Sequence, residues 1–158
     1  MSDINVSVDG FDRLMRQLKT VSNPTSVLQH SFTQSMAQIQ AQAKLLAPVD
    51  TGMLRNSIKT KTLVQGQSVK GVIFSNCSYA PYLEFGTGKV GQSSPCESRQ
   101  YVSVSYRQTS WIYTPDGQHF YKTDGQKAQP YMYPAIKMGF DVLKRNLERD
   151  IQTAIRSV

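Results

Sequence analysis

One apolar stripe constrains the fold of this chain more than any other feature of its sequence. Six apolar residues recur at steps of three or four, the spacing that places side chains on one face of an α-helix. This stripe predicts an amphipathic helix of about 20 residues. Pro48 ends it, because the residue before a proline avoids helical backbone angles. The members of the stripe are Leu28, Phe32, Met36, Ile39, Ala43 and Leu46.

The C-terminal part of the chain carries a second stripe with helical spacing. Pro134 suits the first turn of this second helix, where the missing amide hydrogen costs nothing. Each stripe must be buried against another element, so the two helices alone predict a packed core. The members of the second stripe are Ile136, Phe140, Leu143, Leu147, Ile151 and Ala154.

Short β-strands are predicted around these helices from alternating or continuous apolar patterns bounded by turn residues. They cover residues 4–8, 57–64, 68–74, 101–106, 111–113 and 119–121. We therefore expect an α+β fold: an antiparallel sheet of about five or six short strands with two long amphipathic helices, one after the N-terminal strand and one C-terminal. The length of 158 residues suits one domain, residues 1–158, with a variable loop-and-hairpin insertion at about 88–127.

The charge of the chain favours acidic partners without indicating a dedicated nucleic-acid reader. The formal net charge is +7, and residues 51–83 contain Arg55 and three lysines but no acidic residue. The basic residues form no continuous run of the kind found in binding tails. The N-terminus lacks a secretion signal, and no apolar stretch is long enough for a membrane span, so we expect synthesis in a cytoplasm.

No pattern in the sequence points to catalysis. The sequence lacks a nucleophile elbow, a phosphate-binding loop and the residue spacing of a metal site. Its two cysteines and two histidines are isolated from one another, so no cofactor or metal is expected. Asp50 and Glu84 are the acidic residues in conspicuous surroundings. An acid–base pair is one interpretation. We favour the other, in which Asp50 caps a turn and Glu84 bonds backbone or pairs with a basic residue, so an enzyme is not predicted.

Three segments in a fixed order carry a resemblance to a known family. They are Ala47-Pro-Val-Asp-Thr-Gly-Met-Leu-Arg-Asn-Ser-Ile58, Tyr79-Ala-Pro-Tyr-Leu-Glu-Phe-Gly-Thr87 and Gln129-Pro-Tyr-Met-Tyr-Pro-Ala135. Together they resemble the minor tail, or tail-completion, proteins of siphophages over about residues 25–157. The third segment has Tyr131 where the family usually has Phe, and the aromatic hairpin around Trp111 recurs in some members. The stretch 88–108 looks like a variable insertion.

The resemblance implies a structural virion protein of a long-tailed phage. Its subunits would form a homo-oligomeric ring of six at the head–tail junction, joining the connector to the tail around the DNA channel. Its neighbours would be the connector or stopper and the tail terminator or tail tube. Genomic DNA would pass through the lumen without sequence-specific contacts. Neither a membrane nor a small-molecule substrate is implied.

The same resemblance assigns structural roles to the residues of the three segments. Gly52 and Gly86 would allow tight turns, Arg55 and Glu84 are candidates for an ion pair within or between subunits, and the loop 88–108 with the Trp111 hairpin would clasp a neighbouring ring. The interface and structural candidates are Asp50, Thr51, Gly52, Leu54, Arg55, Tyr79, Tyr82, Glu84, Gly86, Thr87, Trp111, Pro130, Tyr131 and Pro134.

Three alternatives remain at this point. A tail terminator ring is thought to share the fold. A nucleic-acid-binding domain would use the basic hairpin at residues 55–70, and a small hydrolase would use Asp50 and Glu84.

Overall fold

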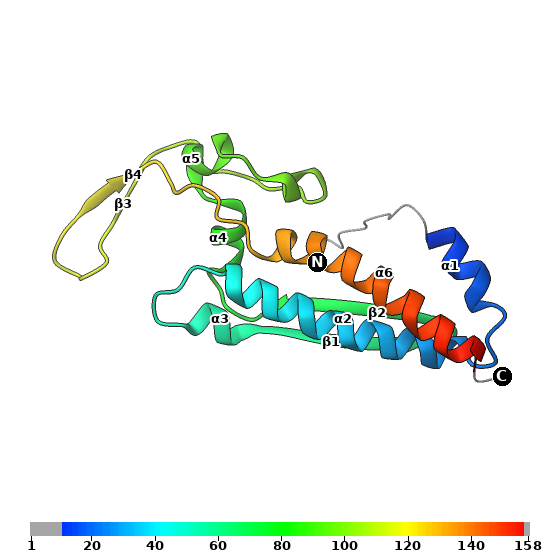
Figure 1. Cartoon of the computed structure of the whole chain (residues 1–158). Helices are drawn as coiled ribbons and strands as arrows, with labels where there is room; N and C mark the ends of the chain where they lie inside the picture. Colours follow the sequence, from blue (N-terminus) through cyan, green and yellow to red (C-terminus); the bar gives the residue numbers. More distant parts are fainter. Residues whose placement is uncertain (1–10, 157–158) are drawn as a thin grey trace.

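Two long helices, α2 (Pro24–Leu46) and α6 (Met132–Arg156), lie side by side in the computed structural model, which describes residues 11–156 (Figure 1). Both were predicted from their apolar stripes and are confirmed. The start of α2 follows capping chemistry: the side chain of Asn23 accepts a hydrogen bond from the Ser26 amide at 3.2 Å, and Pro24 occupies the first turn.

The two helices share a core that is divided into two clusters. One cluster joins the middle and end of α2 to the start of α6 through Ile39, Ala43, Tyr131 and Ala135. The other joins the far ends of both helices to α1 (Phe11–Leu18). Leu46, the last member of the predicted stripe, is 42% exposed, and the neighbouring Ala43 and Ala47 are buried in its place.

A close helix approach depends on Gly139 of α6. A Cβ atom at this position would lie 2.1 Å from Cγ1 of Ile39, so only glycine lets α6 pack this tightly on α2.

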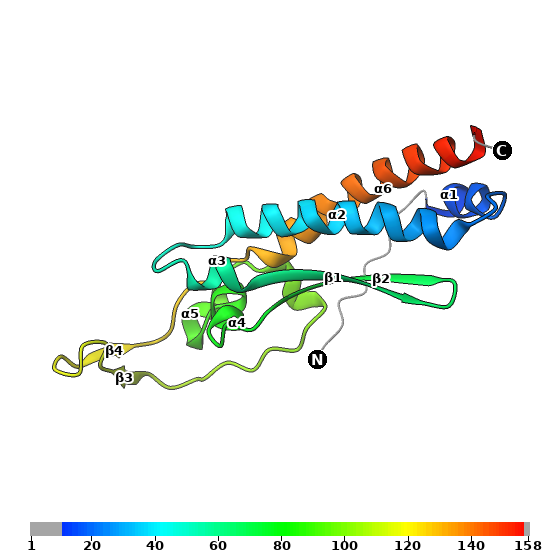
Figure 2. The same cartoon turned by 90° about the horizontal axis from the view of Figure 1, so that it is seen from below.

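An antiparallel hairpin of β1 (Ile58–Gln65) and β2 (Ser68–Ser75) runs along α2, which covers one of its faces (Figure 2). Lys59 and Lys61 lie exposed on β1, and the Lys61 ammonium lies 5.7 Å from the centre of the Phe74 ring. The short helix α3 (Met53–Ser57) leads into β1.

Short elements connect β2 to α6. They are α4 (Ala80–Phe85), α5 (Gly88–Ser93), the 3-10 helix η1 (Glu97–Gln100), β3 (Trp111–Tyr113) and β4 (Tyr121–Thr123). The strands β3 and β4 form a second antiparallel hairpin that projects away from the helices (Figure 1). We call residues 111–123 the arm.

The predicted sheet of five or six strands is wrong. The described residues hold four strands in two separate two-stranded sheets, β1–β2 and β3–β4. The predicted strand 101–106 forms no strand: residues 101–102 are a turn and a bend that follow η1, and residues 103–106 have no regular structure. The aromatic side chains of this segment pack on other elements. Tyr101 stacks on Tyr133 at 5.8 Å between ring centres, and the Tyr106 hydroxyl donates to the Phe85 carbonyl at 2.8 Å. The predicted strand 4–8 lies outside the described residues.

Two smaller predictions also change. Residues 88–93, expected as loop, form α5, and residues 119–120 precede β4 rather than belonging to it. Among residues 11–156, no helix is both long and apolar enough to cross a membrane.

Candidate functional site

A buried carboxylate holds the start of α6. Both oxygens of Glu84, from α4, accept backbone hydrogen bonds. Oε2 accepts from the amides of Tyr131 and Met132 at 2.8 and 2.9 Å, and Oε1 accepts from Tyr133 at 3.0 Å. Glu84 is only 6% exposed. A negative charge at this position satisfies amides that have no partner in the helix and complements its dipole.

The three family-like segments meet at this junction. Leu54 and Ile58 of the first, Ala80 of the second and Tyr131 of the third belong to one core cluster. The Gln129 amide also donates to the Leu83 carbonyl at 2.7 Å. Burial raises the pKa of Tyr131, and the neighbouring Glu84 adds to the rise, so the phenol stays neutral. The segments therefore form one packed structural unit.

The arm is clamped at its base by a tight backbone crossing. The Thr87 amide donates to the Gln126 carbonyl at 3.0 Å, and the Gln126 amide donates back to the Thr87 carbonyl at 3.2 Å. Gly125 has a φ of 112°, and a Cβ there would lie 1.8 Å from the Thr87 carbonyl oxygen. This crossing excludes any side chain at Gly125, so the base of the arm has a fixed path.

The arm itself exposes an unusual amount of apolar surface. Ile112 is 66% exposed and Phe120 is 76% exposed, and the two arm tyrosines, Tyr113 and Tyr121, are each close to half exposed. Its two three-residue strands pack on each other and have few contacts with the other helices and strands. Isolated two-stranded hairpins are marginally stable in water, so an exposed apolar hairpin indicates a surface made for a partner.

The tip of the arm is held by Asp116. Its carboxylate accepts hydrogen bonds from the backbone of His119 and Gln118, and it pairs with the His119 ring. The backbone bond from His119, followed by the His119 side chain, lowers the pKa of Asp116 to about 2. Asp116 is therefore ionised at neutral pH and orders the turn.

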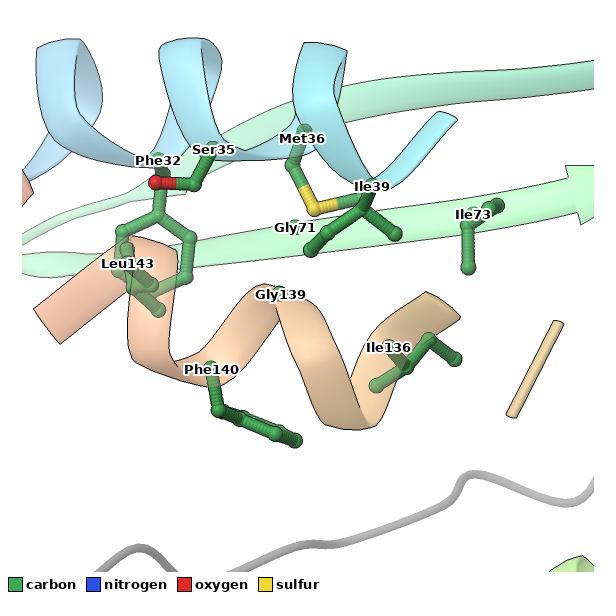
Figure 3. A pocket seen from close by; sticks show the side chains of 10 residues that line it. All are labelled: Phe32, Ser35, Met36, Ile39, Gly71, Ile73, Ile136, Gly139, Phe140 and Leu143. Carbon is green, nitrogen blue, oxygen red and sulfur yellow. The ribbon is translucent and has the colours of Figure 1, made fainter. Parts of the chain in front are cut away.

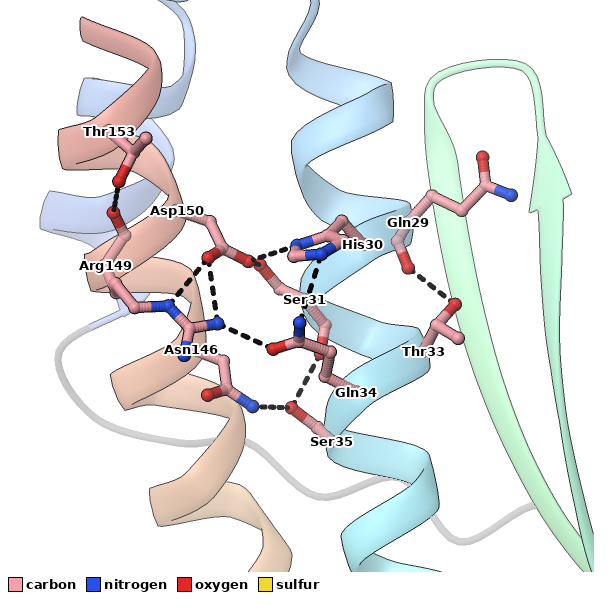
Figure 4. Close-up of polar contacts among 10 residues, drawn as sticks. All are labelled: Gln29, His30, Ser31, Thr33, Gln34, Ser35, Asn146, Arg149, Asp150 and Thr153. Carbon is pink, nitrogen blue, oxygen red and sulfur yellow. Dashed lines mark hydrogen bonds and ion pairs between the residues drawn. The ribbon is translucent and has the colours of Figure 1, made fainter. Parts of the chain in front are cut away.

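A polar seam joins α2 and α6 at the end away from Glu84 (Figure 4). Asp150 accepts from the Ser31 hydroxyl at 2.7 Å and contacts Nδ1 of His30 at 2.9 Å. Burial alone would raise the pKa of Asp150, but the hydrogen bonds from Ser31, His30 and Arg149 outweigh it and lower the pKa. The seam also includes the buried bond from Asn146 to Ser35, at 2.9 Å. It fixes how the two helices are aligned.

An apolar groove of about 160 Å³ opens between α2, β2 and α6 (Figure 3). Ser35 contributes the one polar side chain of its lining. The other nine lining residues are Phe32, Met36, Ile39, Gly71, Ile73, Ile136, Gly139, Phe140 and Leu143.

The first family-like segment places its predicted residues in a turn beside an exposed apolar patch. Gly52 has a φ of 78°, as a turn position requires. In the described chain the Met53 amide donates to Thr51 Oγ1 at 3.4 Å and no hydrogen bond reaches the Asp50 side chain, so a capping role for Asp50 stays a prediction. Exposed apolar residues surround this turn: Leu45, Leu46, Val49 and Met53.

Arg55 and Glu84 form no ion pair within the described subunit. The Glu84 oxygens bond backbone instead, and Nε of Arg55 is buried without a hydrogen-bond partner. An ion pair across an interface stays a prediction. The other candidates divide by burial: Tyr131 and Leu54 are in the core, while Tyr82 is 58% exposed.

Several residues that shape these surfaces were not predicted. Ser31, Ser35 and Asn146 lie in the buried seam, although serine and asparagine favour solvent. Gly125 carries the close crossing at the arm, and only the rule that a glycine marks close backbone approach could have indicated it. Residues 11–156 contain no group of three or more His, Cys, Asp or Glu side chains able to hold a metal ion.

Comparison with known families supports a phage origin. Residues 12–86, just under half of the chain, match the family model described as "Bacteriophage HK97-gp10, putative tail-component". The matched region runs from α1 to the end of α4 and includes Glu84, whereas the arm and α6 lie outside it. No curated protein and no solved structure matches the chain. The match supports a tail-associated structural protein of the phage virion.

Proposed function

We propose that this chain is a subunit of a homo-oligomeric ring of six at the head–tail junction of a long-tailed phage. The ring joins the connector to the tail and surrounds the channel through which DNA passes. Residues 1–158 act as one domain in which 88–127 is an insertion that carries the arm.

The observation that carries this proposal is the arm, clamped at Thr87 and Gln126 and exposing Ile112 and Phe120. An exposed apolar projection of this kind marks a surface that a partner covers, and a tail component has other tail proteins as its neighbours. The exposed patch around Val49 and Met53 offers a second contact surface. A ring needs two contact surfaces per subunit, and the arm supplies one candidate for them.

The basic charge fits a position around DNA. The net charge is +7, and Lys59 and Lys61 are exposed on one strand. Such a surface attracts the phosphate backbone without reading its sequence. A tail terminator ring is the nearest alternative, and it differs in binding the end of the tail tube before heads arrive.

An in vitro joining assay tests the proposal. A phage lysate that lacks this protein should accumulate filled heads and free tails. Adding the purified protein should restore joined particles, and it should do so when added after the tails are complete. Tails of uncontrolled length in the depleted lysate would instead indicate a terminator. Joined particles without the protein would contradict both roles.

A further inference from the structure

We infer that the arm of one copy packs on the next copy of this chain, with the ring of Phe120 in the groove between α2, β2 and α6. This inference rests on the proposed ring and specifies how its subunits contact each other.

The groove matches a phenyl ring in size. Its volume is about 160 Å³, and an apolar cavity of about 150 Å³ binds benzene in a well-studied protein. Phe32, Ile136 and Phe140 line it from two helices (Figure 3). Phe120 is the most exposed large apolar residue of the described chain, at 76%. Covering it would remove the most exposed large apolar side chain of the described residues from water.

The Phe120 ring and the groove lie on different parts of the chain. Phe120 belongs to the projecting arm, whereas Ile39 and Ile136 belong to the helical body. Each copy therefore offers one Phe120 ring and one groove. Contacts between two different surfaces of this kind can repeat head to tail around an axis. The clamp at Gly125 fixes the path of the arm before binding, so little freedom is lost on contact.

Charge does not oppose the same pairing. The arm holds one acidic residue, Asp116 at its tip, and one basic residue, Lys122. A formally neutral arm can therefore approach a neighbouring copy of net charge +7 without net repulsion.

Photo-crosslinking tests the contact directly. p-Azidophenylalanine at position 120 keeps the aromatic ring and forms a covalent crosslink on irradiation. A second preparation carries ¹⁵N but no azidophenylalanine, so a crosslink to a ¹⁵N-labelled peptide joins two different copies. Rings are assembled on tails from the mixture and irradiated, and the adducts are mapped by mass spectrometry. We expect adducts on the labelled peptides that contain Met36, Ile136 or Phe140. The same label at position 74, on the face of β2 opposite the lining residue Ile73, should not reach them.

Association provides the second readout. Phe120→Ala should weaken ring formation at least about 10-fold, because one buried phenyl ring is worth more than that factor. The matched variant Phe74→Ala should leave it unchanged. Ile136→Trp fills the groove from within and should weaken association as Phe120→Ala does.

The outcomes separate the inference from the proposed function. Rings that form with adducts only outside the groove overturn the inference and leave the ring intact. Adducts within the same copy also overturn it. The absence of any ring on tails overturns the proposed function and the inference together.

Discussion

The carboxylate of Glu84 lies against the first turn of α6 and accepts the Tyr131 amide at 2.8 Å, although 47 positions separate the two residues. This bond joins the region that matches the phage tail family to the C-terminal helix beyond it. It also sets the direction in which α6 leaves the base of the arm. The junction therefore links the family-like body to the surface that we propose for assembly.

Removing the Glu84 carboxylate should destabilise the fold strongly. Glu84→Ala leaves three buried or partly buried amides without an acceptor, so we expect a loss of roughly 3 kcal/mol or more in the free energy of unfolding. Glu84→Gln keeps one acceptor oxygen and should cost less. Urea denaturation measures both. Glu97→Ala is the control, since its bridge to Lys137 is solvent-exposed and contributes little to stability. Equal losses for Glu84→Ala and Glu97→Ala would refute the capping role.

Gly139→Ala should destabilise the packing of α2 on α6. The new Cβ would overlap Cγ1 of Ile39, and overpacking of this kind costs about 1–3 kcal/mol. Trimming the opposing residue with Ile39→Ala should relieve the overlap, so the two changes should not add. A double-mutant cycle by urea denaturation measures the coupling. Simple additivity, within about 0.5 kcal/mol, would show that the helices do not meet at this point.

The seam at Asp150 predicts a dependence of stability on acid pH. Its hydrogen bonds lower its pKa below the value of about 3.9 found in unfolded chains. The stabilisation is therefore present above about pH 4 and is lost as pH falls through the lower folded pKa. Asp150→Asn should flatten this part of the pH profile and cost roughly 1–3 kcal/mol at neutral pH. The profile should be compared with that of Asp116→Asn, because Asp116 is an exposed carboxylate whose pKa is also lowered. A wild-type slope in Asp150→Asn would disprove the assignment.

Gly125→Ala should displace the arm while leaving the helical core intact. The added Cβ would collide with the Thr87 carbonyl, and the positive φ of Gly125 disfavours any other residue. Trp111, the single tryptophan, lies half-buried in the arm and reports its position by fluorescence. We expect a shifted emission maximum with a helical melting temperature close to wild type. Gly117 also has a positive φ, but a Cβ there would lie in open space. Gly117→Ala therefore reports the effect of backbone strain without a steric collision. An unchanged emission in Gly125→Ala would contradict the clamp.

Sequence patterns located the helices because buried apolar residues recur along a helix at steps of three or four. Leu28, Ile39 and Ala43 lie in the core as the first stripe predicted, and the Gln65-Gly66-Gln67 turn joins two paired strands. The same patterns failed where pairing depends on distant partners. Residues 101–106 alternate like a strand, yet they pair with no strand in the described part of the chain, and Tyr101 takes helical backbone angles at the end of η1.

The candidate site was less predictable than the helices for a related reason. The sequence marked Glu84 as conspicuous and allowed a backbone role, but nothing local identifies amides 47 to 49 positions away as its partners. Ser35 and Asn146 look like surface residues until the two helices are placed together. Exposure of the arm is also a tertiary property, since Ile112 and Phe120 would suit a buried strand equally well.

The mass of the purified protein in solution, alone and then with tail tubes or connector-bearing heads, tests the central claim most directly. We predict a monomer that becomes a ring of six copies on those particles, with the Trp111 emission shifting as the arm is covered. A monomer that ignores both particles, and instead binds free DNA with a steep salt dependence, would contradict the ring and favour a nucleic-acid-binding domain.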